Sequence, residues 1–395
     1  MNETTRSNAS QSFVATEREL GPGFFATREV AFVRGAGALL FDAEGRRYVD
    51  CGAAYGVASL GYAHPALVEA LTRQARQLGS CTPVFANDQR ARYLAELREV
   101  LPAGLERMFL CNSGTEAIEA ALKFARLTTG RPGVVACMRG FHGRTLGALS
   151  ATWDRKYREP FAPLVPGFVH VPYDDLEALR AALTGDVGAV IVEVVQGEGG
   201  VRPGSAEFLR GAEELCRERG ALFVLDEVQT GFCRTGKLFA LEHHGLAPDL
   251  LCLAKGIAGG FPMGAVALGA RVAALPLGSH GSTFGGSPLA CAVARATLRT
   301  ILEEDLAARV ADTGAWLFER LRPLERIERV REIRGLGLLV GIELRERSAP
   351  FIERLLERGV VALAAGPTVL RLLPPLVITR DELEEAVTAV EEVLA

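Results

Sequence analysis

Lysine is scarce in this chain. Lysine and arginine together number 44, yet the only lysines are Lys123, Lys156, Lys237 and Lys255. Arginine cannot replace lysine where a reaction needs a primary amine. Any catalytic amine supplied by a lysine is therefore limited to four positions.

Other absences exclude whole classes of protein. No basic stretch dominates, and 48 acidic residues outnumber the 44 basic ones, which argues against nucleic acid as a partner. The longest uncharged stretch, 272–294, contains two prolines and four glycines, so it cannot cross a bilayer as a smooth apolar helix. The polar first residues lack the apolar core of a signal peptide. We therefore expect a cytoplasmic protein that does not insert into a membrane.

Metal-binding signatures are also missing. The eight cysteines include no CxxC pair, and no histidine clusters with them at zinc spacing. They are expected to be buried free thiols in a reducing compartment. His243 and His244 form a pair at a predicted helix end, which argues for structure rather than for a metal site. There is no HExxH or GxSxG motif.

What the sequence does contain is a large apolar content and a regular alternation. Hydrophobic residues make up 49% of the 395 positions, which fits a large core and more than one lobe. Predicted helices are separated by short apolar runs. The helices are at 89–100, 115–129, 174–183 and 205–219, and the runs are at 134–138, 168–171, 189–194, 222–225, 250–254 and 265–268. This pattern predicts an α/β fold with a mostly parallel sheet covered on both faces.

The ends of the chain differ from this middle part. Residues 32–50 predict a hairpin, and 65–78 predict a helix. After residue 287, helices and strands no longer alternate regularly, which predicts a smaller α+β domain. We divide the chain into an arm at 1–20, an N-terminal part of the small domain at 21–62, a large domain at 63–286 and a C-terminal small domain at 287–395.

One lysine stands where ligands bind in such sheets. Lys255 follows the apolar run 250–254 and precedes a glycine-rich turn. Ligands of doubly wound sheets sit at the carboxyl ends of strands. Burial lowers the pKa of a lysine and makes it a competent nucleophile. The alternative is a surface lysine after an edge strand, and the other three lysines fit that description better.

Three further segments are candidates for the same site. Asp226 and Gln229 follow the apolar run 222–225. The segment 112–116 (NSGTE) precedes a helix and is either a simple capping box or a cup of backbone N–H groups for a phosphate. Phe141 and Arg144 follow another strand, where they are either a ring-stacking residue and a carboxylate ligand or ordinary packing and surface residues.

Together these features predict one cofactor. Pyridoxal phosphate needs a phosphate cup, an aromatic ring to stack on its own ring, an acid for its ring nitrogen and a lysine that forms an imine with it. The sequence supplies a candidate for each requirement.

At this point the chain resembles a known family along nearly its whole length. The segments NSGTEA, FHGRT, QGEGG, LDEVQTG, RTGK, LAKGIAGGFPMGA and STFGGSPLA are similar to those of class III aminotransferases of fold type I. Within that class the chain most resembles the acetylornithine and LysW-γ-lysine aminotransferases. YGVASLG, KYREPFAPLV and AGPTVLRLLPPLVI lean toward the lysine branch. The resemblance implies a transferase that moves a terminal amino group between an α-N-acylated diamino acid and 2-oxoglutarate.

The resemblance also implies roles around the cofactor. Lys255 would form the imine and move the proton, and Asp226 would pair with the ring nitrogen. Gln229 would bind the ring oxygen, and Val228 and Phe141 would enclose the ring. Gly114 and Thr115 would bind the phosphate. Thr283, beside Ser282, would reach the phosphate of the neighbouring subunit, so the active unit would be a homodimer.

The substrate residues follow from the same resemblance. Arg144 would bind the α-carboxylate of the long amino donor, with Ser282 among the substrate-side residues. Arg371 would bind the α-carboxylate of glutamate or 2-oxoglutarate, and Glu198 would pair with it when the long donor is bound. Glu193 would orient His142 or a water molecule. The LysW carrier protein is a further possible partner.

Four positions depart from the family pattern: Ile118, Val194, Cys233 and Ser287. None of them removes a catalytic group. Other functions remain open at this level. They are an ornithine or 4-aminobutyrate type of aminotransferase, an aminomutase with the same cofactor, and an inactive dimeric scaffold. The scaffold predicts loss of Lys255 or Asp226, and both are present.

Overall fold

A seven-stranded sheet forms the centre of the molecule, which a computed structural model describes from residue 9 to residue 395. Its strand order is β4-β12-β11-β10-β7-β5-β6. The strands are β4 (Arg107–Cys111), β5 (Gly133–Cys137), β6 (Phe168–Val171), β7 (Val187–Val192), β10 (Leu222–Asp226), β11 (Leu250–Leu253) and β12 (Gly264–Leu268). Neighbouring strands are parallel except around β12, which runs antiparallel to both β11 and β4.

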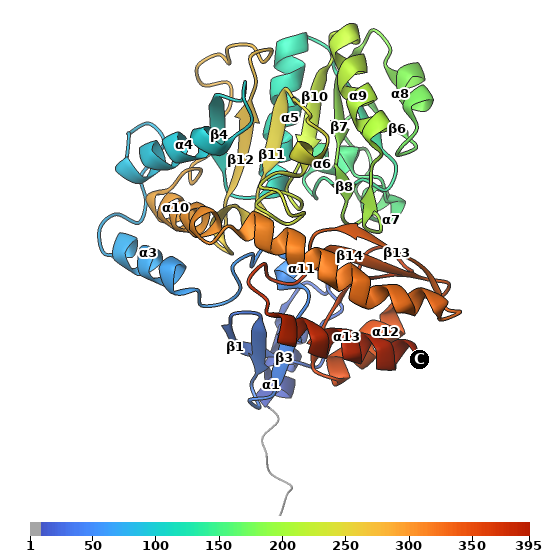
Figure 1. The fold of residues 1–395 in the computed structure, drawn as a ribbon. Coiled ribbons are helices and arrows are strands. Elements are labelled where there is room, and N and C mark those ends of the chain that lie inside the picture. Colours follow the sequence, from blue (N-terminus) through green and yellow to red (C-terminus); the bar gives the residue numbers. More distant parts are fainter. Residues whose placement is uncertain (1–8) are drawn as a thin grey trace, which may run out of the picture.

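Helices cover this sheet. They include α5 (Gly114–Thr129), α6 (Leu146–Ala151), α8 (Leu176–Ala182) and α9 (Ala206–Arg219). Figure 1 shows these helices around the strands in the upper part of the molecule. Strands β5, β7, β10, β11 and β12 are buried along their whole length. That burial explains why they appear in the sequence as continuous apolar runs rather than as alternating ones.

Two four-stranded sheets lie in the lower part of Figure 1, below the long helix α10 (Pro288–Glu303). The first has the order β1-β2-β3-β15 and contains β1 (Phe32–Ala36), β2 (Leu39–Asp42), β3 (Arg47–Asp50) and β15 (Val360–Val361). The second has the order β13-β14-β17-β16 and contains β13 (Val330–Leu336), β14 (Leu339–Leu344), β16 (Leu363–Ala364) and β17 (Val369–Leu372). The parallel pairing of β15 with β3 joins the C-terminal part to the N-terminal hairpin.

The remaining elements surround these sheets. They are α1 (Ala9–Leu20), α2 (Ala53–Gly56), α3 (Pro65–Ala75), α4 (Asp88–Val100), α7 (Arg155–Arg158), α11 (Leu306–Leu321), α12 (Ala349–Glu357), α13 (Arg380–Leu394) and the short pair β8 (Val195–Gln196) and β9 (Arg202–Pro203). Between residues 9 and 395, no helix is long and apolar enough to cross a membrane.

The predicted alternation agrees closely with these elements, but it omits β4, the short helices α6 and α7 and the short strands β8 and β9. Strand β4 was not predicted, because its sequence RMFLC begins with an exposed arginine and is only partly buried. The first eight residues of the predicted arm lie outside the described residues, and the rest of it forms α1. The division into four parts at 20, 62 and 286 stays a prediction.

Candidate active site

Lys255 lies just beyond the end of β11. Its backbone adopts a positive φ of 44°, which starts the 3-10 turn Lys255–Ala258. Burial lowers the pKa of the Lys255 ammonium below its usual value. The carboxylates of Glu198 and Asp226 oppose this shift, and the charge of Arg371 adds to it. The Lys255 amine is therefore buried near both carboxylates and a guanidinium, at the carboxyl end of the central strand β11.

Asp226 ends the neighbouring strand β10 and is 4% exposed. One carboxylate oxygen lies 2.7 Å from Nδ1 of the buried His142, and the other accepts the backbone N–H of Val228 at 3.0 Å. Burial alone would lower the pKa of His142, but the hydrogen bond and charge of Asp226 outweigh it and raise that pKa. The pairing with His142 and the main chain holds the Asp226 carboxyl group in one orientation at the end of β10.

Glu193 was predicted to orient His142 or a water molecule. Among residues 9–395 it forms no hydrogen bond with His142, and a role toward water stays a prediction. Its two carboxylate oxygens accept the backbone N–H groups of Phe141 and Gly197, at 3.0 and 3.1 Å. Asp226 orients the histidine instead. Burial raises the pKa of Glu193 to about 7, against the opposing charge of His142. Glu193 thus joins the loop after β5 to the loop after β7, a role that its position in the sequence could not reveal.

The segment 112–116 begins helix α5, and only one half of the predicted capping box is present. Ser113 accepts the N–H of Glu116 at 3.3 Å, which leaves the N–H groups of Gly114 and Thr115 without an intrahelical partner. A side chain on Gly114 would place its Cβ 2.7 Å from a methyl group of Val228. The reciprocal half of a capping box is replaced by a bond from the Asn112 N–H to the Glu116 carboxylate at 2.7 Å. The Ser113 cap is compatible with a phosphate cup, because it uses one N–H and leaves others free.

An ion pair crosses the site between two distant parts of the chain. Arg371 on β17 donates from Nη1 to the Glu198 carboxylate at 2.6 Å and to the side-chain oxygen of Gln229 at 3.2 Å. Gln229 in turn donates to Glu198 at 3.3 Å. Burial alone would raise the pKa of Glu198, but Arg371, Lys255 and these hydrogen bonds outweigh it and lower that pKa.

Two nitrogen atoms of the Arg371 guanidinium, Nε and Nη2, have no hydrogen-bond partner among residues 9–395. Arg371 is the largest fully buried side chain of the described chain, with an exposed fraction of 0%. Buried guanidinium donors without an acceptor are costly, so a carboxylate ligand would satisfy them.

Arg144 and Phe141 lie at the outer side of the site. The exposed Arg144 guanidinium stacks 3.6 Å from the centre of the Tyr157 ring and 5.5 Å from that of Phe141. In the part of the chain that the structure describes, Arg144 makes no side-chain hydrogen bond. Stacking restrains the guanidinium while its donors stay open, which suits a carboxylate ligand.

Ser282 and Thr283 differ in their surroundings. Ser282 accepts from the side chain of Asn112 at 3.1 Å and from the N–H of Gly285 at 3.0 Å, all within one chain. Thr283 is exposed. The geometry thus keeps Ser282 beside the start of α5, and the predicted contact of Thr283 with a second subunit stays a prediction.

Two of the four departures from the family pattern have a structural explanation. Ile118 is fully buried in α5, where it packs in the core below the sheet. Ser287 accepts the N–H of Ala290 at 3.3 Å and so provides the N-cap of α10, as asparagine would. The carbonyl of Val194 accepts hydrogen bonds from Gly204 and Tyr173, as a proline carbonyl could, so nothing in the structure explains the valine. Cys233 has a positive φ of 70°, a conformation that favours glycine, and nothing in the structure explains its choice.

Arg234 is a residue of this region to which the sequence analysis assigned no role. It is 2% exposed and donates to the carbonyl oxygens of Leu338 and Pro374, at 3.0 and 2.6 Å. Burial lowers its pKa to about 9. Its sequence signals are an arginine directly after the apolar pair Phe232 and Cys233 and its place in the family-like segment RTGK. Its hydrogen bonds to Leu338 and Pro374 hold the loop after β10 against the turn between β13 and β14 and against the segment that follows β17.

These groups fit a phosphorylated pyridine cofactor. Gly114 and Thr115 offer free N–H groups at a helix N-terminus, and Asp226 offers a carboxylate held by His142. Lys255 offers an amine with a lowered pKa, and Arg371 offers unused donors. Among residues 9–395 no group of three or more potential metal ligands gathers.

Comparison with known proteins agrees with this geometry. Residues 25–394 match the family model described as aminotransferase class-III. The chain is 50% identical over 386 residues to a [LysW]-aminoadipate semialdehyde transaminase of Deinococcus radiodurans, covering 97% of this chain and 90% of the relative. It is 46% identical over 368 residues to an acetylornithine aminotransferase of Methanopyrus kandleri, covering 92% and 94%.

Solved structures give the same result for the fold. The ornithine aminotransferase of Toxoplasma gondii superposes with a TM-score of 0.94 at 36% identity, covering 98% of this chain and 94% of that one. The acetylornithine aminotransferase of Elizabethkingia anophelis gives 0.86 at 33% identity, covering 98% of both chains. The predicted α/β fold of type I and the predicted family resemblance are confirmed.

Proposed function

The chain belongs to the class-III aminotransferase family, which uses pyridoxal phosphate, and on that premise we propose that it transfers a terminal amino group. The donor is an α-N-acylated diamino acid, LysW-γ-lysine or N2-acetylornithine or both, and the acceptor is 2-oxoglutarate. The names of relatives with 50% and 46% identity support this range of donors. The α-acyl group would keep the aldehyde product from cyclising.

The observation that carries the proposal is the Glu198–Arg371 pair. Two substrates of different length must react at one point, and only glutamate carries a carboxylate next to the reacting carbon. Arg371 is fully buried and has unused donors for that carboxylate. The long donor has a methylene chain there, so Glu198 would neutralise Arg371 in that half-reaction, as it does at 2.6 Å in this structure.

The remaining residues take the roles that the sequence predicts. Pyridoxal phosphate, when bound, supplies a carbonyl that takes up an amine and a ring that accepts electrons. Lys255 would hold and return a proton at Nζ, and Asp226 would face the ring nitrogen as a carboxylate. Gly114 and Thr115 would bind the phosphate, with Val228 and Phe141 on the two ring faces and Gln229 at the ring oxygen.

The outer residues would bind the far end of the long donor. Arg144 would bind the donor's α-carboxylate with the donors that stacking on Tyr157 leaves open. Ser282 would lie on the substrate side. The active unit would be a homodimer in which Thr283 reaches the phosphate site of the other subunit. The protein would act in the cytoplasm in lysine or arginine biosynthesis, with the LysW carrier as a partner if the donor is tethered.

Separate measurement of the two half-reactions tests the proposal. Stopped-flow absorbance of the holoenzyme would follow reaction with glutamate and with N2-acetylornithine. Glu198→Ala should impair the acetylornithine half-reaction more, and Arg371→Ala should impair the glutamate half-reaction more. Charge-assisted pairs of this kind are worth ~1.5–3 kcal/mol, or about 10- to 100-fold in rate. Equal losses in both half-reactions for both variants would refute the proposed exchange.

An ornithine-type aminotransferase is the second candidate. The TM-score of 0.94 to the ornithine aminotransferase of Toxoplasma gondii favours it. The two candidates differ in what they require at the α-nitrogen. Comparison of ornithine with N2-acetylornithine as donors would decide between them, and a preference for the free diamine would favour the second candidate.

A further inference from the structure

Arg371 belongs to a row of three residues that crosses the sheet β13-β14-β17. Arg334 on β13 lies directly opposite Gly341 on β14, and Gly341 lies directly opposite Arg371 on β17. Directly opposite residues project their side chains from the same face of a sheet. Two arginines about 10 Å apart therefore project from one face, with a glycine between them.

One loop covers this row. A side chain on Gly341 would place its Cβ 2.8 Å from the Cβ of Val201, so Val201 rests directly on the middle of the row. Glu198 lies over one end, where it pairs with Arg371. Gly200 lies near the other end, where its missing side chain would meet Arg334 at 3.2 Å. The segment 198–201 therefore runs along the row from one arginine to the other.

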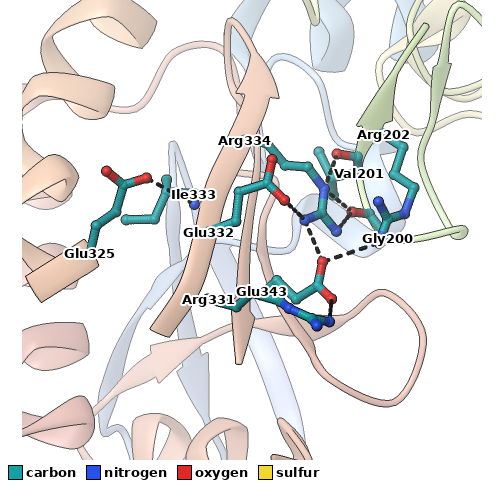
Figure 2. Close-up of polar contacts among 9 residues, drawn as sticks. All are labelled: Gly200, Val201, Arg202, Glu325, Arg331, Glu332, Ile333, Arg334 and Glu343. Atoms are coloured by element: carbon teal, nitrogen blue, oxygen red, sulfur yellow. Dashed lines mark hydrogen bonds and ion pairs between the residues drawn. The ribbon is translucent and has the colours of Figure 1, made fainter. Parts of the chain in front are cut away.

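Arg334 binds the backbone of this loop rather than a side chain. Its guanidinium donates to the carbonyl of Gly200 at 3.0 Å from Nε and at 2.6 Å from Nη2, and to that of Val201 at 3.1 Å. Figure 2 shows the guanidinium facing both carbonyls. Such contacts fix the loop backbone while leaving the side chain of Glu198 free to move.

The guanidinium is itself held in place by acids. Arg334 also bonds to Glu332 and Glu343, and Glu343 accepts from Arg202 at 3.1 Å and from Arg331 at 3.3 Å. The side chains of Arg334 and Glu343 are 9% and 8% exposed. Burial would raise the pKa of Glu343, but the hydrogen bond and charge of Arg334 outweigh it. Each of the three guanidinium nitrogens of Arg334 thus donates at least one hydrogen bond, which holds the side chain in one orientation.

We propose that Arg334 is a positioning residue that holds the loop 198–201 in register over Arg371. With the backbone fixed, the exchange of substrates moves only the Glu198 carboxylate and not the loop. Arg334 then keeps the same contacts with the loop in both half-reactions, and Arg371 changes its partner with the substrate. The inference rests on the proposed function, because it assigns Arg334 an effect only through the Glu198–Arg371 pair.

The test compares half-reactions in the holoenzyme. Arg334→Met keeps the aliphatic bulk but removes every donor to the loop. We expect it to lower the acetylornithine half-reaction about tenfold relative to the glutamate half-reaction, as misplaced Glu198 leaves Arg371 bare. Arg334→Lys, which retains one charged donor, should recover part of this loss. Gly341→Ala should shift the same ratio in the same direction without changing any charge, because it displaces Val201.

A double-mutant cycle shows whether Arg334 acts through Glu198. In a Glu198→Ala background, Arg334→Met should leave the ratio of half-reactions unchanged. Arg320→Met is the matched control, because Arg320 bonds to Glu384 and Glu391 in the same part of the chain but away from the loop. It should lower the melting temperature without changing the ratio.

Two results would overturn the inference. One is an equal loss of both half-reactions in Arg334→Met, as expected of a purely structural residue. The other is a change in the ratio that is as large in the Glu198→Ala background as in the wild type. Failure of the proposed function would look different. In that case the Glu198→Ala variant alone, with Arg334 intact, would leave the ratio of half-reactions at the wild-type value, and Arg334 would have nothing to position.

Discussion

At the scale of single residues, the site depends on charges held in unusual states by burial. Lys255 has a lowered pKa because burial disfavours its ammonium form. His142 has a raised pKa because Asp226 outweighs its burial. The pKa of the amine is thus lowered and the pKa of the imidazole is raised within one site, a combination that is typical of functional sites.

Substitution of Lys255 should therefore have two effects. Lys255→Met should lower transamination by at least about a thousandfold, because the amine would supply both the imine and the proton transfer. It should also change how the stability of the cofactor-free protein depends on pH. The unfolded chain keeps the Lys255 proton up to a higher pH than the folded chain, so the wild-type free energy of unfolding rises with pH between those two pKa values.

Thermal denaturation of both cofactor-free proteins across the alkaline range is the measurement. The wild type should gain stability relative to Lys255→Met as the pH rises through that window. Parallel curves would show that the lysine has an ordinary pKa. Lys237→Met is the control, since Lys237 is exposed and should leave the pH profile unchanged.

At the scale of elements, local sequence predicted the site better than it predicted the contacts between strands. Lys255 and Asp226 could be predicted because each directly follows a continuous apolar run. The row of Arg334, Gly341 and Arg371 could not, because register between strands depends on turns and packing far along the chain. Strand β4 was missed for a similar reason, since it is a short strand at the edge of the sheet and its own sequence does not specify its pairing with the distant β12.

The N-terminus of α5 gives a prediction at this scale. Gly114→Ala should weaken binding of pyridoxal phosphate about tenfold, because the new Cβ would lie 2.7 Å from Val228 and displace either the helix start or the valine. Titration of the cofactor-free protein, followed by absorbance, measures the dissociation constant. Addition of Val228→Ala should recover part of the affinity.

Gly185→Ala provides the control, because a side chain there would meet nothing within 4 Å. It should leave cofactor affinity unchanged. Wild-type affinity in Gly114→Ala would show that the start of α5 does not hold the phosphate.

At the scale of the whole molecule, apolar surface near the start of α5 suggests assembly. Phe85 and Phe284 are each 65% exposed. Arg90 donates to the carbonyl of Phe85 and lies against Gly286, so the two aromatic side chains belong to one region. Exposed apolar groups that gather in this way are typical of contact surfaces between proteins. The region also contains Thr283, the residue we propose to act across a dimer interface.

Mixed dimers test that proposal for the whole assembly. Lys255→Ala and Thr283→Ala homodimers should each have low activity, and dimers formed from one subunit of each should regain up to about half of the wild-type activity per dimer. The reason is geometric: if Thr283 serves the other subunit, the subunit that keeps Lys255 receives an intact Thr283 from the Lys255→Ala partner, so one complete site forms. Differently tagged subunits, refolded together and purified through both tags, allow the measurement. If Thr283 serves its own chain, every site keeps one defect, and the mixed dimer should show only the average activity of its two parents.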